Sequence, residues 1–212
     1  MHNSLNNLLS IQSEIDNKKV NVIAVSKTFP INHILPLINH GHNHFGENKV
    51  QEAIEKWSDI KKDMPNIKLH LLGKLQTNKV KFVFPLFDYL HSLDSLKLAQ
   101  KISDEQKKKK FIAKIFIQIN VGKENQKNGI YEEDLENFYN ICKNDLGLNI
   151  IGLMCIPPFD QDPEPHFEKI KSLSKKLALN ELSMGMSNDY SKAIKNGSTY
   201  VRIGSKIFGS RG

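Results

Sequence analysis

Short apolar runs alternate with amphipathic stretches along the whole chain. Eight runs have the length and the residue types of strands: Val20–Ser26, His42–Gly46, Lys68–Gly73, Tyr89–Leu93, Ala113–Val121, Asn149–Ile156, Leu182–Met186 and Tyr200–Phe208. Five stretches between them have helical spacing: Glu47–Ile60, Ser95–Lys107, Tyr131–Lys143, His166–Leu179 and Asp189–Asn196. A further short helix is expected between Pro30 and Pro36.

This strict alternation of strand and helix predicts a parallel sheet covered by helices. Eight such units in 212 residues fit a closed (β/α)₈ TIM barrel. The alternative, an open doubly wound sheet, usually carries a glycine-rich first turn. Residues 25–30 contain no glycine, and no linker, repeat or low-complexity tract divides the chain. The sequence therefore predicts a single α/β barrel domain over residues 1–212.

The composition indicates a globular protein but does not indicate an activity. Hydrophobic residues make up 39% and charged residues 25%, which is typical of a globular chain. No apolar run approaches the ~20 residues needed to cross a bilayer, and the N-terminus lacks the features of a signal peptide. Cys142 and Cys155 are too few for a disulfide scaffold, and we expect both to be buried in the core. A cytoplasmic protein with no membrane association is expected.

The formal net charge of +7 raises the question of nucleic-acid binding. Only Arg202 and Arg211 among the 30 basic residues are arginines, although arginine dominates base recognition. The dense run at residues 107–110 follows an amphipathic stretch, where lysines favour a helix C-terminus. We therefore predict no nucleic-acid partner. RNA binding through the basic surface is a minor alternative, and its affinity would fall steeply with salt.

Lys27 stands at the end of the first predicted strand, directly after an apolar run. Barrel enzymes build their sites from the C-terminal ends of strands. A lysine at this rim is partly desolvated, which favours the neutral amine that Schiff-base chemistry requires. Most other lysines lie in polar helical stretches, where a solvated position is expected.

The last two units carry a pattern typical of phosphate binding. Ser187 lies in the loop at 183–189, and Gly204 and Ser205 lie in the loop at 202–209. Barrels commonly bind phosphate with the loops after strands seven and eight, where glycine allows close approach of backbone N–H groups. A Schiff-base lysine beside a phosphate cup suggests a ligand with both an aldehyde and a phosphate, as in pyridoxal 5′-phosphate (PLP).

Arg202 lies within an apolar strand, which argues against a position on the solvated surface. Against the pyridine nitrogen of PLP, a guanidinium keeps its own proton and leaves the ring nitrogen unprotonated. That arrangement weakens the cofactor as an electron sink. The alternative is a structural ion pair across the barrel.

Sequence blocks along nearly the whole chain resemble one family. They lie at residues 24–27, 45–52, 70–79, 118–121 with 127–129, 152–154, 182–189 and 197–211. In this order they resemble the pyridoxal phosphate homeostasis proteins, single-domain barrels related to the N-terminal barrel of alanine racemase. The resemblance implies seven cofactor-binding residues: Lys27 as the aldimine lysine, Arg202 at the pyridine nitrogen, Ser187, Gly204 and Ser205 at the phosphate, and Asn48 and Met184 near the cofactor.

The resemblance also implies a role as a PLP carrier or buffer that affects amino-acid and keto-acid balance. A monomer is expected, and PLP-dependent apo-enzymes are possible recipients of the cofactor. The first alternative is a PLP-dependent enzyme such as an amino-acid racemase, which needs an acid–base group on each face of the substrate. Related racemases take a tyrosine from a second domain; here only Tyr190 and Tyr200 are candidates. The second alternative is a barrel that binds a phosphorylated metabolite, with Lys27 as a counter-ion.

Three alternating histidines, His40, His42 and His44, would lie on one face of a strand and could hold a metal. They precede Phe45 at the start of the second predicted strand, and at least His40 and His42 lie at the N-terminal end of the barrel, opposite the predicted site. We therefore expect a solvent-facing start of the strand and no metal.

Overall fold

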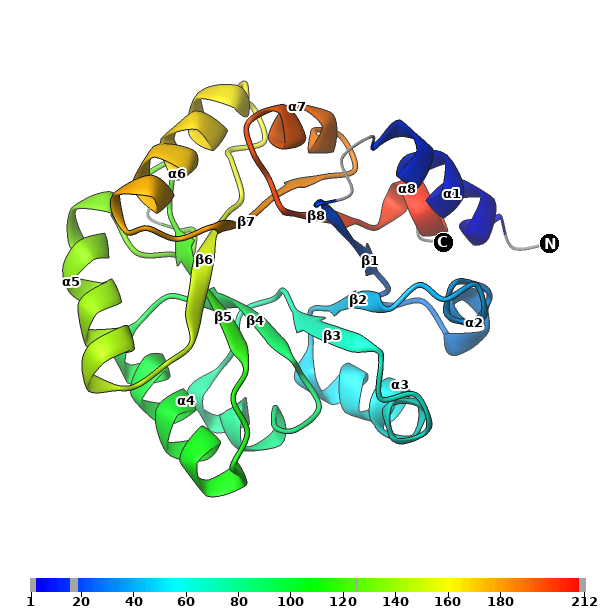
Figure 1. Ribbon diagram of the computed structural model, residues 1–212, viewed down its shortest axis with the longest axis horizontal. Coiled ribbons are helices and arrows are strands. Elements are labelled where there is room, and N and C mark those ends of the chain that lie inside the picture. Colours follow the sequence, from blue (N-terminus) through cyan, green and yellow to red (C-terminus); the bar gives the residue numbers. More distant parts are fainter. Residues whose placement is uncertain (1–2, 16–18, 125, 210–212) are drawn as a thin grey trace.

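The computed structural model describes residues 3–15, 19–124 and 126–209, and its eight strands close into a barrel (Figure 1). Every strand runs parallel to its neighbours, and β8 pairs with β1. The strands are β1 (Asn21–Val25), β2 (His44–Glu47), β3 (Lys68–Leu71), β4 (Tyr89–Leu93), β5 (Lys114–Ile119), β6 (Ile150–Cys155), β7 (Glu181–Met186) and β8 (Tyr200–Ile203). The predicted (β/α)₈ barrel is confirmed.

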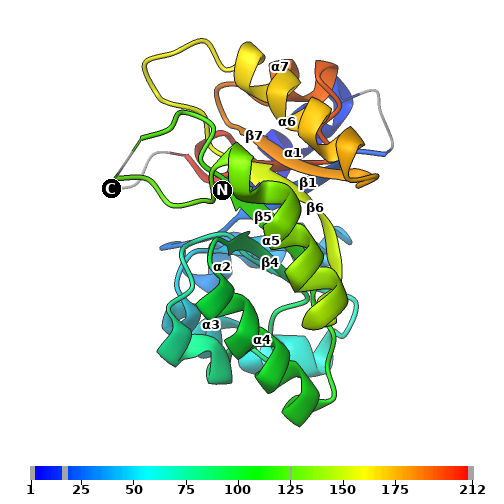
Figure 2. The ribbon, with the colours of Figure 1, turned by 90° about the vertical axis from the view of Figure 1, so that its left-hand side faces the viewer.

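Helices surround the barrel on the outside in both views (Figures 1 and 2). They are α1 (Ser4–Glu14), α2 (Ile31–Asn39), α3 (Val50–Asp63), α4 (Leu96–Lys109), α5 (Leu135–Asn140), α6 (Glu164–Lys176), α7 (Tyr190–Lys195) and α8 (Ser205–Phe208). A 3₁₀ segment, Thr77–Phe82, stands between β3 and β4, and α5 is flanked by a 3₁₀ turn at Glu132–Asp134 and a π turn at Ile141–Asp145. Among these described helices, none combines the length and apolar character that a membrane span requires.

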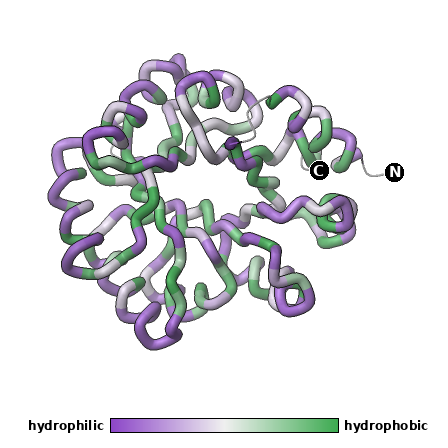
Figure 3. Tube along the Cα trace, in the orientation of Figure 1, coloured by the Kyte–Doolittle hydropathy of each residue, from purple (hydrophilic) through white to green (hydrophobic). Residues whose placement is uncertain are grey.

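Two apolar cores hold the layers together. Because side chains alternate along a strand, Val22 and Ala24 of β1 face the helices, while Ile23 and Val25 face the lumen of the barrel. Hydrophobic residues accordingly follow the strands, and hydrophilic ones occupy the outer turns of the helices (Figure 3). The lumen core consists of Ile23, Val25, Tyr89, Phe116, Met154 and Tyr200.

The predicted strand Tyr200–Phe208 is wrong in its second half. β8 ends at Ile203, and Ser205–Phe208 forms the short helix α8. A short apolar run carries too few residues to separate a strand from a helix by its period. Ser210 and Arg211, which close the last block of the family resemblance, lie outside the described residues.

Two helices also differ from the prediction. α1 was not among the predicted elements. Its N-cap Asn3 makes no side-chain cap hydrogen bond, its first turn carries no acidic residue and its last turn carries no basic residue, so the usual terminal signals are missing. α2 continues through Pro36 to Asn39 instead of lying between the two prolines. Pro36 sits in the sixth position of the helix, where it lacks the N–H that would donate to the carbonyl four residues earlier.

Candidate functional site

A cavity of about 960 Å³ opens at the C-terminal ends of the strands. Its wall comes from residues that follow β1, β2, β6, β7 and β8, so segments distant in sequence meet there. Six of the seven predicted cofactor-binding residues line it: Lys27, Asn48, Ser187, Arg202, Gly204 and Ser205. The structure thus brings the amine of Lys27 and the guanidinium of Arg202 to one cavity.

Met184 is the exception, because its side chain does not line the cavity. It is fully buried among the apolar residues between the sheet and the helices, whereas Met186 lines the cavity. Gly185 causes the difference: it has φ +90°, and a Cβ there would lie 2.6 Å from the Cβ of Ala193 on α7. Strand alternation therefore breaks at Gly185, because only glycine adopts this conformation without strain. Met184 and position 185 both face the helices, and Met186 turns to the cavity.

Arg202 is buried and donates three hydrogen bonds to uncharged groups. Its Nη1 donates to the carbonyl oxygen of Ser183 (2.6 Å) and to Ser183 Oγ (2.7 Å), and its Nη2 donates to the carbonyl oxygen of Cys155 (2.8 Å). No carboxylate within the described ranges forms an ion pair with it, so the alternative of a cross-barrel ion pair is not observed there. A guanidinium has five N–H donors, which leaves two for a ligand in the cavity.

The ends of β7 and β8 bring hydroxyl and backbone N–H groups to the same cavity. Ser187 Oγ accepts a hydrogen bond from the Lys206 amide (3.4 Å), which ties the loop after β7 to the start of α8. Gly204 is the N-cap and Ser205 the first residue of α8, and the backbone N–H groups of a first helical turn have no partner within the helix. Four of the described lining residues are cationic and one is acidic: Lys27, Lys127, Lys192, Arg202 and Asp189. This balance favours an anionic ligand.

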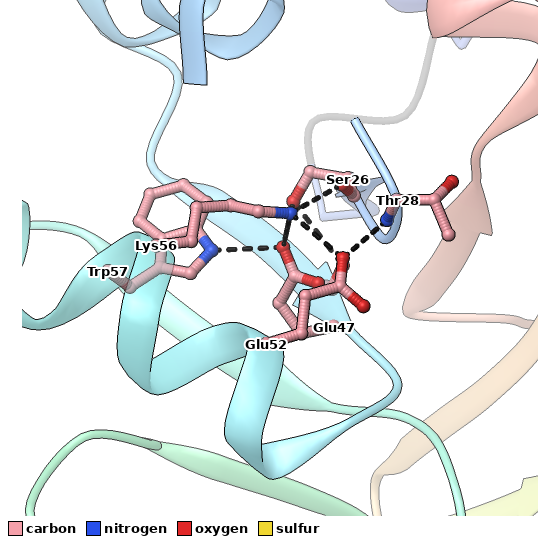
Figure 4. A network of polar contacts seen from close by, with 7 residues as sticks. Ser26, Thr28, Glu47, Glu52, Lys56 and Trp57 are labelled. Atoms are coloured by element: carbon pink, nitrogen blue, oxygen red, sulfur yellow. Dashed lines mark hydrogen bonds and ion pairs between the residues drawn. The ribbon is translucent and has the colours of Figure 1, made fainter. Parts of the chain in front are cut away.

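A charged network outside the barrel fixes the backbone before Lys27 (Figure 4). Glu47 is fully buried, and its Oε1 accepts hydrogen bonds from Ser26 Oγ (2.8 Å), Lys56 Nζ (2.9 Å) and Trp57 Nε1 (2.9 Å). Lys56 Nζ also donates to the carbonyl oxygen of Ser26 (2.9 Å). Both the side chain and the carbonyl of the residue before Lys27 are therefore anchored to β2 and α3.

The same network holds the residue after Lys27 (Figure 4). The Thr28 amide donates to Glu52 Oε1, which also accepts from Lys56 Nζ (3.2 Å). Thr28 has φ +68°, an unfavourable conformation for a β-branched residue. Burial by itself would raise the pKa of Glu52, but the hydrogen bonds from Thr28 and Lys56 outweigh it and lower the pKa. The chain is thus held on both sides of Lys27.

The sequence did not single out this network. Glu52 and Lys56 are four residues apart on a predicted helix, a spacing that usually marks a solvated ion pair. The sequence also predicts Glu47 as the polar first residue of that helix, although the structure shows it as the last residue of β2. Only the contact between α3 and the end of β1 reveals that these residues support Lys27.

The histidine prediction is partly wrong. His40 is exposed as expected, but His44 is largely buried and its Nδ1 lies 2.9 Å from Nε2 of His70 on β3. No cluster of three or more potential ligands for a metal occurs within the described part of the chain. Cys142 and Cys155 are both buried, as predicted, and burial raises the pKa of each thiol to about 12.

The two tyrosines considered as acid–base groups lie away from the cavity. Tyr200 is buried in the lumen core at the start of β8, and the Tyr190 hydroxyl contacts Glu14 and Lys206. Neither belongs to the residues that line the cavity.

Comparison with known proteins identifies the family to which this chain belongs. A sequence model of the alanine racemase N-terminal domain matches residues 2–212. The pyridoxal phosphate homeostasis protein of Aquifex aeolicus is 38% identical over 199 residues, which is 90% of this chain and 86% of the relative. The protein of the same name from Escherichia coli is 34% identical over 203 residues, or 92% and 87% of the two chains.

Solved structures agree with this relationship. PipY of Synechococcus elongatus, solved with PLP bound, superposes with a TM-score of 0.89 at 33% identity and covers 97% of this chain and 100% of its own. Alanine racemase of Clostridium difficile, at 14% identity and a TM-score of 0.78, covers 99% of this chain and 57% of its own, and shares the fold. Fold and cavity define a barrel of the alanine racemase N-terminal class. Within that class, the chain belongs to the pyridoxal phosphate homeostasis protein family.

Proposed function

We propose that this chain binds PLP covalently through the ε-amine of Lys27 and acts as an intracellular carrier or buffer of the cofactor. The observation that carries the proposal is the shared cavity, which is lined by a strand-end amine, a buried guanidinium, and hydroxyl and amide donors. PipY, a structural neighbour at 33% identity, has been solved with PLP bound.

The donor set fits the chemical groups of this cofactor. A Schiff base with the aldehyde requires an amine such as that of Lys27. Ser187, Ser205 and the Gly204 amide suit the phosphate, and the remaining N–H groups of Arg202 suit the pyridine nitrogen. When bound, PLP supplies an electron sink; an arginine at its nitrogen limits that property. Asn48 stands in the cavity wall beside these groups.

We further propose that the protein is not a racemase. Racemisation needs a second acid–base group opposite Lys27. Lys127 is paired with Glu124, Lys192 with Asp162, and the Asp189 carboxylate accepts a hydrogen bond from the Met186 amide. The side chains of these three described residues therefore already have partners within the protein. Delivery of PLP to apo-enzymes, a monomeric state and the extent of the domain over residues 1–212 belong to the same proposal.

A visible absorption spectrum followed by borohydride reduction tests the proposal. We expect a yellow protein that bleaches on reduction and carries the phosphopyridoxyl mass on the peptide containing Lys27. A colourless protein that cannot be reconstituted with PLP would overturn it. An amino-acid racemisation assay on the loaded protein tests the second part, and turnover that Lys27→Ala abolishes would make the protein an enzyme.

A further inference from the structure

A row of polar side chains crosses the barrel lumen behind Arg202. Ser183 Oγ, which accepts from Arg202 Nη1 (2.7 Å), lies 2.8 Å from Nδ1 of His91. His91 Nε2 lies 2.9 Å from Nδ1 of His70, and His70 Nε2 lies 2.9 Å from Nδ1 of His44. This lumen chain, Ser183–His91–His70–His44, connects the cavity with the start of β2 at the opposite end of the barrel.

The surroundings keep the inner members of the lumen chain uncharged. His70 stacks on Tyr89, with ring centroids 4.1 Å apart, and His91 stacks on Phe116 at 4.4 Å. Both histidines are fully buried, and this burial lowers the pKa of each well below the usual value; the charge of Arg202 lowers that of His91 further. A neutral imidazole has one N–H donor and one acceptor nitrogen.

Arg202 determines the direction of the chain because it can only donate. Ser183 Oγ therefore accepts from Arg202, and its own hydrogen has His91 Nδ1 as the acceptor in the described part of the chain. A buried hydroxyl hydrogen without an acceptor would cost about 1–3 kcal/mol. His91 consequently carries its proton on Nε2 and donates to His70, which carries its proton on Nε2 and donates to His44.

This direction turns the acceptor side of every member toward Arg202. The aligned dipoles stabilise a buried cation, and no carboxylate among the described residues pairs with it. A carboxylate partner would neutralise the guanidinium. An uncharged chain leaves its positive charge available to a ligand in the cavity.

We propose that Ser183, His91 and His70 are positioning residues that hold Arg202 as an un-neutralised cation facing the cavity. The chain is static and does not conduct protons, because its end at Arg202 cannot accept one. The effect on cofactor binding rests on the proposed function, whereas the direction of the hydrogen bonds does not.

Long-range ¹H–¹⁵N correlation spectra of the histidine rings test the direction on the purified full chain at pH 7.5. We expect His70 and His91 to be neutral, each with its proton on Nε2. A proton on Nδ1 of either ring, or averaging of the two nitrogens by exchange along a conducting chain, would overturn the proposal. This measurement needs neither a variant nor bound PLP.

Substitution of Ser183 tests the link to the cavity. Ser183→Ala removes the hydroxyl between Arg202 and His91, and we expect about tenfold weaker PLP binding, a shifted absorption maximum of the loaded protein and a changed His91 Nδ1 resonance. Ser183→Thr, which keeps the hydroxyl, should restore all three. Ser198→Ala is the matched control, because Ser198 is another buried serine, and within the described part of the chain its Oγ donates to backbone carbonyls alone, those of Leu182, Met184 and Tyr200.

The two measurements separate the two hypotheses. If the parent chain binds no PLP while both rings carry their protons on Nε2, the proposed function fails and the chain direction stands. If Ser183→Ala folds and binds PLP with the affinity and spectrum of the parent, the positioning role is overturned and the proposed function stands.

Discussion

The two cations of the cavity are held in opposite ways. Lys27 is held through its backbone by a charged network outside the barrel, in which Glu47 and Glu52 meet Lys56. Arg202 is held through its guanidinium by carbonyl and hydroxyl oxygens inside the barrel. One network fixes the backbone on both sides of Lys27, and the other fixes the charged group of Arg202 itself.

This difference suits the chemistry proposed for each residue. A nucleophilic amine must reach an aldehyde and change its bonding, so a fixed backbone on both sides of Lys27 sets the position from which its side chain extends. A guanidinium that recognises a ring nitrogen must point an N–H group at that nitrogen, so several acceptors hold the plane of the guanidinium. Neither Glu47 nor Glu52 lines the cavity, so the carboxylates of the charged network stay away from the anionic ligand that the cavity favours.

Lys27→Ala is expected to have the largest effect. Covalent attachment of PLP should be lost completely, while the free energy of unfolding stays within about 1 kcal/mol of the parent, since Lys27 lies at the rim and its backbone supports remain. Absorption after PLP addition and urea unfolding measure the two effects. Lys97→Ala, an exposed lysine on α4, is the matched control. A variant that no longer melts cooperatively would contradict this placement of Lys27.

Glu47→Ala should break the charged network and act on stability. It removes the common acceptor of Ser26, Lys56 and Trp57, and breaking a buried ion pair typically costs about 3–5 kcal/mol. Urea unfolding measures the loss, with Glu55→Ala on the exposed face of α3 as the control, expected to change stability by less than about 1 kcal/mol. Equal stability of the two variants would mean that the network does not anchor the chain beside Lys27.

The sequence was sufficient for the barrel and for the residues that stand at strand ends. Alternating runs determine the topology, and a barrel places every strand C-terminus at one mouth, so Lys27 and the loops around Ser187 and Ser205 could be brought together without coordinates. Arg202 was recognisable because an arginine within an apolar strand needs a buried partner.

The supports of these residues could not be predicted in the same way. Ser183, His91 and His70 come from three strands, and only the closed barrel makes them neighbours. A histidine within a strand indicates neither its partner nor its tautomer. Met184 was placed near the cofactor by the family resemblance alone, whereas strand alternation puts its side chain on the helix side with that of Leu182. The positive φ of Gly185 then brings the side chain of Met186 to the cavity.

Acid should weaken the interior of the barrel. Burial lowers the pKa of His42 and of His44 from 6.5 to about 4, and lowers those of His70 and His91 further. Between pH 6.5 and 4 the unfolded chain binds protons that the folded chain excludes, so the stability is fully present above pH 6.5 and falls as the pH decreases. Each histidine contributes up to about 1.4 kcal/mol per pH unit.

Urea unfolding at pH 7.5 and pH 5.5, at constant ionic strength, measures this dependence. His44→Asn removes one of the four groups and should reduce the slope accordingly. An identical midpoint at both pH values would show that the lumen histidines accept protons in the folded protein, which contradicts an uncharged support for Arg202.

Ser205→Asp should have the smallest effect and tests the phosphate side of the cavity. A carboxylate there would repel the phosphate, and we expect PLP affinity to fall about tenfold, or roughly 1.4 kcal/mol. Ser205→Asn has nearly the same size without the charge, so it should bind within about threefold of the parent. Because Ser205 is exposed, added salt should narrow the gap between the two variants. Equal affinities at low salt would remove Ser205 from the phosphate site and leave anion recognition to Ser187 and the backbone.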